Sequence, residues 1–419
     1  MLNAKQEREE TYFYRAGRAT QRHPWTFVTA LLVISIPLVA VAFTAPLAYD
    51  FYQQLPSGHP ATDGLRELGN HFGPGFAVPL YGLVTFSAPL LVGNATNASE
   101  FTQVADLTLR TETTSGVASV QSLIGPSGTT LANWLNLSTL PVGTRANLLG
   151  VASSFIGTDG RTVLFDIQTN ASGLSLSAVT TLHALEASWG SYSATQPNIE
   201  KLAYGGGASV IDDLANETAY ATELMIVAVT VGLVIVLLAV LRSWIIALMG
   251  VATIGLSISW AWAVSYLVFQ QLLGFPLFFY VRTILFIFIL GLGIDYNIFL
   301  LTRVREERVR GRANTEAAVE GVARTGGIIT AAAVILASAF GALLVGSFTL
   351  IRAIGFSVAI AVILDAMVVR TYLVPACLQV LGERVWTWTG RRPKTGEERP
   401  AAGRDRSPPM GEGTGPARP

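Results

Sequence analysis

Three ionisable side chains lie inside long apolar stretches of the sequence, namely Asp295, Asp365 and Arg370. A charge surrounded by hydrocarbon costs several kcal/mol, so such residues are usually functional. Asp295 is followed directly by Tyr296. An acid with little water around it, beside a phenol that can donate to its charged form, can take up and release protons. We therefore interpret Asp295 and Tyr296 as a proton relay.

Two glycines precede this pair and bear on its surroundings. On a helix, Gly291 lies one turn before Asp295, and Gly293 lies three residues before Tyr296. Because glycine has no side chain, a neighbouring helix can approach closely at these positions. We expect the acid and the phenol at a tight helix–helix contact. The alternative interpretation is a hydrogen-bonded polar clamp that holds helices together without moving protons.

The other two ionisable residues in apolar stretches, Asp365 and Arg370, have two interpretations. Asp365 and Arg370 are five residues apart, which is a poor spacing for a pair on an α-helix, so we expect each to have a partner elsewhere. Arg370 would neutralise a carboxylate at the depth of Asp295. Stabilisation of the helix bundle and a part in the mechanism are equally good interpretations. Thr330 and Ser338 would extend a polar path, although such hydroxyls often bond to their own backbone.

An enzyme is the competing class of function. An intramembrane aspartyl protease would use Asp295 and Asp365 as its two acids, after a Gly-x-Gly-Asp sequence. Here the acid comes one residue later, which turns it about 100° around the helix. The four histidines are scattered, and Cys377 is the single cysteine, so there is no metal-binding or nucleophile pattern. We expect neither enzyme activity nor a cofactor or metal.

Six apolar stretches must position these residues. The chain has 419 residues, of which 51% are hydrophobic and 13% charged, and its mean hydropathy is +0.48. Each stretch can cross roughly 30 Å of hydrocarbon, and the first is longer than the ~7–15 residues of a signal-peptide core. The sequence therefore predicts an α-helical polytopic membrane protein. The predicted transmembrane helices cover residues 25–48 and, within 224–381, residues 224–241, 244–267, 278–301, 326–350 and 353–381.

Charge predicts the orientation of these helices in a cell membrane. Lysines and arginines number five in residues 1–24, six in 302–325 and eight in 383–419, whereas residues 49–222 carry five against thirteen acids. Basic segments stay in the cytoplasm, so both termini are predicted inside. We expect 302–325 to form an amphipathic loop along the inner membrane surface and the tail to be disordered. A net charge of zero argues against a nucleic-acid partner.

Residues 49–222 are long enough to form an extracytoplasmic domain. Strands are predicted at 76–86, 116–124, 161–167 and 201–204, with helices at 97–111 and 175–191. This order predicts an α+β sandwich of the split βαβ kind, and the glycines after residue 204 predict a turn into the second span. Five sequons for N-glycosylation are either chance products of a Ser/Thr-rich composition or real sites: Asn94, Asn97, Asn136, Asn170 and Asn216.

The sequence resembles the MMPL branch of the RND transporter superfamily over about residues 20–385. Four stretches carry the resemblance: DFYQQLPSGHPATDGLRELGNHFGPGFAVPL, GLGIDYNIFLLTRVREE, AVEGVARTGGIITAAAVILASAFGALL and AIGFSVAIAVILDAMVVRTYLVPACLQVLGE. The resemblance implies a porter-like outer domain and a proton-driven export of lipids or other hydrophobic molecules. It also implies that Asp295 and Tyr296 are the proton site.

The chain departs from the family in size. Typical members carry two such halves with twelve helices, and this sequence corresponds to one half. We therefore expect a homodimer or pairing with another half-size unit. Protein-export helpers of the same superfamily are also six-helix halves and supply one alternative function. A lipid-sensing or scaffold protein that does not transport supplies another.

Overall fold

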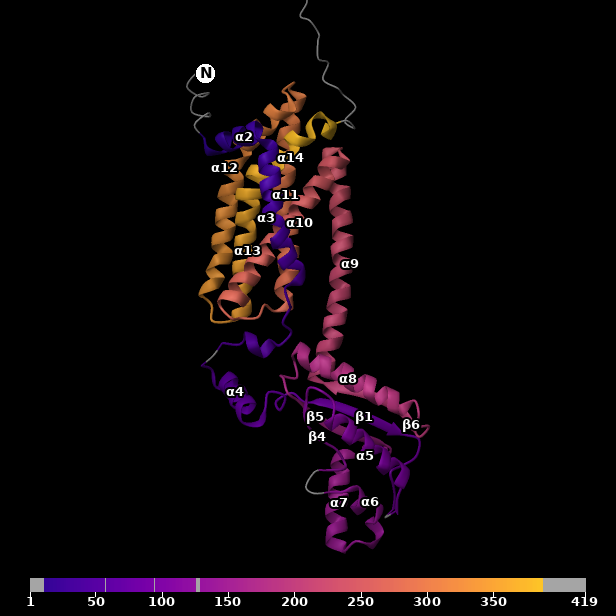
Figure 1. The fold of residues 1–419 in the computed structure, drawn as a ribbon. Helices are drawn as coiled ribbons and strands as arrows, with labels where there is room; N and C mark the ends of the chain where they lie inside the picture. The colour runs from indigo at the N-terminus through magenta and orange to yellow at the C-terminus, as the bar shows by residue number, and fades with distance from the viewer. Residues whose placement is uncertain (1–10, 57, 94, 126–128, 387–419) are drawn as a thin grey trace, which may run out of the picture.

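The structure, a computed structural model, describes residues 11–56, 58–93, 95–125 and 129–386. Six helices are long and apolar enough to cross a membrane, which confirms the predicted polytopic helical architecture. A helical bundle forms one end of the molecule and an α+β domain forms the other (Figure 1). The six helices are α3 (Pro24–Thr44), α9 (Gly207–Leu241), α10 (Trp244–Tyr266), α11 (Phe279–Val309), α12 (Asn314–Gly341) and α13 (Thr349–Leu364).

The sixth membrane helix changes its winding halfway along. After α13 the chain forms a π-helix, η6 (Asp365–Leu373), and then returns to the α form in α14 (Val374–Leu381). Within this segment the amide of Val374 donates to the carbonyl of Val369, five residues back. Pro375 follows at once, and a proline ring pushes away the carbonyl four residues before it. A widened π turn at this place accommodates the proline without breaking the helix.

Helix α9 joins the α+β domain, which we call the outer domain after its predicted side of the membrane, to the bundle. It is 35 residues long and begins directly after the last strand, so the predicted turn is reduced to a junction at Gly206 and Gly207. Gly206 has φ +93°, a conformation that a side chain would strain. The predicted second span, 224–241, is therefore the C-terminal half of a longer continuous helix (Figure 1).

The outer domain has the predicted split βαβ topology. Its sheet has the order β4-β5-β1-β6, and every neighbouring pair is antiparallel. Two helices that follow β1 and β5 pack on one face of the sheet. The strands are β1 (Leu80–Phe86), β4 (Val117–Gln121), β5 (Thr162–Thr169) and β6 (Ile199–Gly206), and the helices are α5 (Ala98–Glu112) and α8 (Leu176–Ser193). Further elements are η1 (Phe51–Gln54), α4 (Pro60–Phe72), β2 (Leu91–Val92), β3 (Ala95–Thr96), α6 (Leu131–Leu135) and α7 (Val142–Phe155).

Trp189 of α8 is the centre of the outer domain's core. It is fully buried, packs edge-on against Phe165 of β5, and donates its indole N–H to the hydroxyl of Thr111 on α5 at 3.0 Å. Gly82 of β1 lies directly beneath the ring, where a Cβ atom would be 2.4 Å from it. The domain thus has an aromatic core of its own. Because the chain has a single cysteine, an intramolecular disulfide cannot stabilise the domain, and this core has to do so.

The prediction for residues 302–325 is wrong in its secondary structure, because they do not form one loop. Instead of a loop along the membrane surface, α11 continues to Val309 and α12 begins at Asn314, so the two helices form a hairpin. Glu307 is 1% exposed and forms ion pairs with four arginines of the hairpin. The charges of this segment thus form ion pairs with one another within the hairpin. The four arginines are Arg303, Arg310, Arg312 and Arg324.

A helix that we did not predict lies across the same end of the bundle. It is α2 (Tyr12–Arg22), at the top of the bundle in Figure 1. Gly17 of α2 meets the backbone of Val319 on α12, and the hydroxyls of Tyr12 and Tyr372 are 2.7 Å apart. The predicted disordered tail, 383–419, lies outside the described residues from 387 onward.

Candidate functional site

Asp295 lies on the outer face of α11 rather than inside the bundle. Its side chain is exposed, and so are Gly291, one turn before it, and Phe299, one turn after it. No residue that the structure describes forms a hydrogen bond or an ion pair with the Asp295 carboxylate. Helical geometry explains this placement. Gly293 faces the bundle, and Asp295, two residues later, lies about 200° further around the helix axis, so it faces away from the bundle.

The two glycines of this segment therefore do different things. Gly293 is buried against α10, where a Cβ atom would come within 3.3 Å of Ile254. It forms the close helix contact that we expected for both glycines. Gly291 has open space around it. It shares the exposed stripe with Asp295, and so leaves room beside the acid on the outer face of the single chain.

Tyr296, the residue after the exposed acid, contacts a buried cluster of charge. It is half-buried, and the guanidinium of Arg370 lies over its ring, 4.9 Å from the ring centre. Such a cation–π contact contributes about 2 kcal/mol when it is shielded from water. The ring of Tyr296 thus faces Arg370, whereas Asp295, one residue before it on α11, is exposed on the side away from the bundle.

Asp365 and Arg370 pair with each other, contrary to the expectation from their spacing. Arg370 donates from Nε to Asp365 Oδ2 at 2.7 Å, and from Nη2 to the same oxygen. Both side chains are buried, with 6% and 2% of their surfaces exposed. The expectation failed because it assumed α-helical winding. In the π turn η6, a residue stacks over the one five positions earlier, so this spacing becomes the pairing one.

The ion pair is anchored to two other helices. Ser257 of α10 is fully buried and donates to Asp365 Oδ1 at 2.8 Å. Arg370 Nη2 donates to the backbone carbonyl of Gly293 on α11 at 3.1 Å. The cluster thus fixes α10, α11 and the π turn to one another at the depth of the Gly-Leu-Gly-Ile-Asp-Tyr stretch.

Two buried polar atoms beside this cluster have no hydrogen-bond partner among the described residues. They are Arg370 Nη1 and Asn297 Oδ1. Asn297 lies one turn after Gly293, on the buried face of α11, and is 2% exposed. Our sequence reasoning missed Asn297 and Ser257, and the signal that could have found Asn297 is its position two residues after Asp295 in a membrane span. Unsatisfied atoms of this kind mark a place where water or another polar group can enter.

The remaining predicted site residues are dispersed. Thr330 contacts the sulfur of Met367 at 3.8 Å, and Ser338 donates to the backbone carbonyl of Val334 at 2.7 Å. Ser338 is therefore satisfied within its own helix. Of the sequons, Asn94 lies outside the described residues, Asn97 is half-buried, and three are exposed, Asn136, Asn170 and Asn216.

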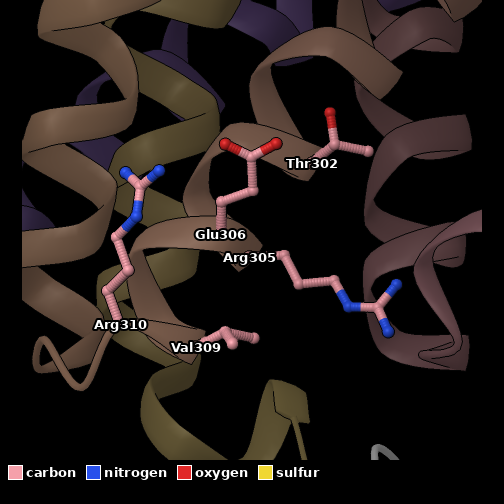
Figure 2. A pocket seen from close by; sticks show the side chains of 5 residues that line it. All are labelled: Thr302, Arg305, Glu306, Val309 and Arg310. Carbon is pink, nitrogen blue, oxygen red and sulfur yellow. The ribbon is translucent and has the colours of Figure 1, made fainter.

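Two open pockets border α11 on either side of Asp295 along the helix. One has a volume of about 420 Å³ and is lined by Thr302, Arg305, Glu306, Val309 and Arg310 (Figure 2). Arg305 extends from it towards α9 and donates to the carbonyl of Val240 at 2.9 Å. The other, of about 370 Å³, lies between α9 and the start of α11 and includes Tyr280 and Thr283. In the described part of the chain, no cluster of His, Cys, Asp or Glu could hold a metal ion.

A sequence model of the MMPL family matches residues 53–405. The chain is also 25% identical, over 91% of its length, to the mycolic acid-containing lipids exporter MmpL11 of Mycolicibacterium smegmatis. It is 32% identical over 56% of its length to the sulfolipid-1 exporter MmpL8 of Mycobacterium tuberculosis, and 42% identical over 39% to the putative membrane protein SCO0839 of Streptomyces coelicolor. These matches cover 37%, 22% and 23% of the three relatives, so the chain spans well under half of their length.

Proposed function

The chain belongs to the MMPL family, and from that premise we propose that it exports lipids or other hydrophobic molecules, driven by protons that pass through Asp295 and Tyr296. Two of its relatives are named as lipid exporters. The observation that supports the proton part is the sequence of surroundings along α11. An exposed acid is followed directly by a half-buried phenol, and a buried arginine covers the ring of that phenol.

In this proposal Asp295 is the group that gains and loses the proton. Its carboxylate has no hydrogen-bond or ion-pair partner among the described residues, so no fixed contact in a single copy holds it. Arg370 is already paired with Asp365, which leaves the positive charge inside the bundle neutralised whatever Asp295 does. Tyr296 would donate to the charged form of Asp295, and the cation over its ring would hold it in place.

The outward direction of Asp295 supports an assembly of two halves. An exposed acid in the middle of a membrane span is costly against lipid, and a second half would cover it. We propose a two-fold homodimer with the α11 stripes of Gly291 and Asp295 facing each other, because two-fold contacts are reciprocal and are the commonest oligomer symmetry. Pairing with a different half-size protein would cover the same stripe. We further propose that both termini are cytoplasmic, as the distribution of basic residues predicts.

Lipid translocation is the direct test of the proposed function. The purified protein would be placed in vesicles that contain a fluorescent lipid, and lipid in the outer leaflet would be followed after a pH gradient is imposed. We expect gradient-dependent translocation with the natural sequence and with Glu306→Gln, which removes an exposed acid of the same helix. We expect Asp295→Asn to lose it. A translocation rate that does not depend on the pH gradient, or that is unchanged in Asp295→Asn, would refute the proposal. The interpretation of Asp295 and Tyr296 as a polar clamp between helices would then remain.

A further inference from the structure

The buried guanidinium of Arg370 uses only part of its hydrogen-bonding capacity. Its N–H groups on Nε and Nη2 donate to Asp365 and to the backbone carbonyl of Gly293. The N–H groups on Nη1 have no acceptor among the described residues, and only 2% of the residue is exposed. A charged donor that is shut off from bulk water and lacks an acceptor needs a further polar group beside it.

An acceptor without a donor lies in the same place. Asn297 is 2% exposed, and its Oδ1 has no hydrogen-bond partner among the described residues. The Gly293 carbonyl, which accepts from Arg370 Nη2 at 3.1 Å, also accepts the amide of Asn297 one turn later in the α-helical pattern of α11. Because helical side chains lean towards the N-terminus, the side chain of Asn297 leans back towards this carbonyl. Arg370 Nη1 and Asn297 Oδ1 therefore lie close to one carbonyl, yet they do not bond to each other.

Other buried polar side chains of the bundle show the usual arrangement, in which the protein itself supplies the partner. Ser265 donates to a backbone carbonyl of its own helix, and Asn314 donates to the carbonyl of Leu378 at 2.7 Å. At Asn297 and Arg370 a donor and an acceptor instead stay unpaired next to each other. This combination indicates a ligand that can bond to both.

Water is the small ligand that satisfies both atoms. It accepts from Nη1 and donates to Oδ1, and two hydrogen bonds of about 2.8 Å in series join atoms that are too far apart to bond directly. A metal cation would be repelled by the guanidinium, and an anion would be repelled by the amide oxygen. Asp365 already neutralises the charge of Arg370, so this place needs no further charge.

We propose that Asn297 and Arg370 hold a water molecule inside the bundle, and that Asn297 acts through this water as a positioning residue for Tyr296. The guanidinium lies over the Tyr296 ring, 4.9 Å from its centre. A water on Nη1 fixes the plane of the guanidinium, which in turn fixes the ring against it. The positioning role rests on the proposed function, in which Tyr296 donates to Asp295.

Radiolytic labelling detects such a water without a transport assay. The protein would be placed in lipid nanodiscs in isotopically labelled water and exposed to a short X-ray pulse. Hydroxyl radicals formed from a bound water oxidise the side chains beside it, and mass spectrometry locates the label. We expect label at Tyr296. We expect none at Trp260, which is 3% exposed and whose indole N–H donates to Ser35 at 3.1 Å.

Three variants show whether Asn297 holds this water. Asn297→Leu keeps a branched side chain and removes the acceptor, so we expect the occupancy of the water, and with it the labelling of Tyr296, to fall about tenfold. Asn297→Ser keeps an oxygen that can accept, and should keep the label. Ser259→Ala is the matched control, because the Ser259 hydroxyl on α10 donates to the carbonyl of Gly255 at 2.9 Å, and it should change nothing.

Proton flux measured against pH tests the positioning role. In Asn297→Leu we expect the pH of half-maximal flux to move by about half a unit or more, and in Asn297→Ser to stay at the natural value. The inference is overturned if the natural protein has no label at Tyr296, if Asn297→Leu keeps the label, or if the pH profile of Asn297→Leu is unchanged. Labelling does not depend on transport, so a chain that moves no protons still reveals the water, and the two proposals fail separately.

Discussion

Removal of the Arg370 side chain is expected to destabilise the bundle more than any other single change at the site. In Arg370→Ala the Asp365 carboxylate, 6% exposed, keeps its bond from Ser257 but loses its charge partner. The carbonyl of Gly293 loses a donor as well. Breaking a buried ion pair from one side costs about 3–5 kcal/mol. We expect a loss of that size in the free energy of unfolding.

The double variant Asp365→Asn, Arg370→Gln separates the charge from the hydrogen bonds. It removes both charges and keeps donors and acceptors of similar length, so most of the lost stability should return. Reversible unfolding in mixed detergent and SDS micelles, followed by circular dichroism, measures each free energy. If the free energy of unfolding of Arg370→Ala lies within about 1 kcal/mol of that of the natural protein, or if the double variant is no more stable than the single one, the buried ion pair does not stabilise the bundle.

Three further predictions concern the relay and the outer domain. Tyr296→Phe keeps the ring beneath Arg370 and removes the hydroxyl, so we expect normal stability but reduced transport with a shifted pH profile, measured as translocation rate against pH. Gly82→Val would drive a side chain into Trp189 and should abolish folding of the outer domain, whereas Gly205→Ala, which meets open space, should be tolerated in the same expression and melting assay. Burial and the bond to Asp106 raise the pKa of Tyr192 to about 12. Its stabilising effect is complete below the ordinary value near pH 10 and is lost as pH rises to 12, so Tyr192→Phe should flatten the alkaline part of the stability curve.

The parts of the fold that follow from local periodicity could be predicted from the sequence. Apolar length alone located the six spans, and the β-branched and aromatic residues of 76–86 located β1. The order of strands and helices then gave the split βαβ topology, because that order leaves few ways to build a two-layer sandwich.

The parts that depend on tertiary contact could not be predicted. The pairing of Asp365 with Arg370 needs a π turn, and its cause, the later Pro375, gives no periodic signal. The outward direction of Asp295 follows from which side of α11 packs on α10, and Gly291 and Gly293 look alike in the sequence. The arginines near Glu307 resemble a membrane-surface pattern until the α11–α12 hairpin brings them together.

Proton flux measures most directly whether Asp295 carries the protons that drive transport. Proteoliposomes that enclose a pH-sensitive dye would be given a pH gradient, and the rate of dye response would be compared for three proteins. We predict a clear flux for the natural sequence and for Glu306→Gln, and a loss of more than about a hundredfold for Asp295→Asn, which keeps the size of the side chain but cannot exchange a proton. A flux in Asp295→Asn equal to that of the natural protein would show that Asp295 does not carry the protons.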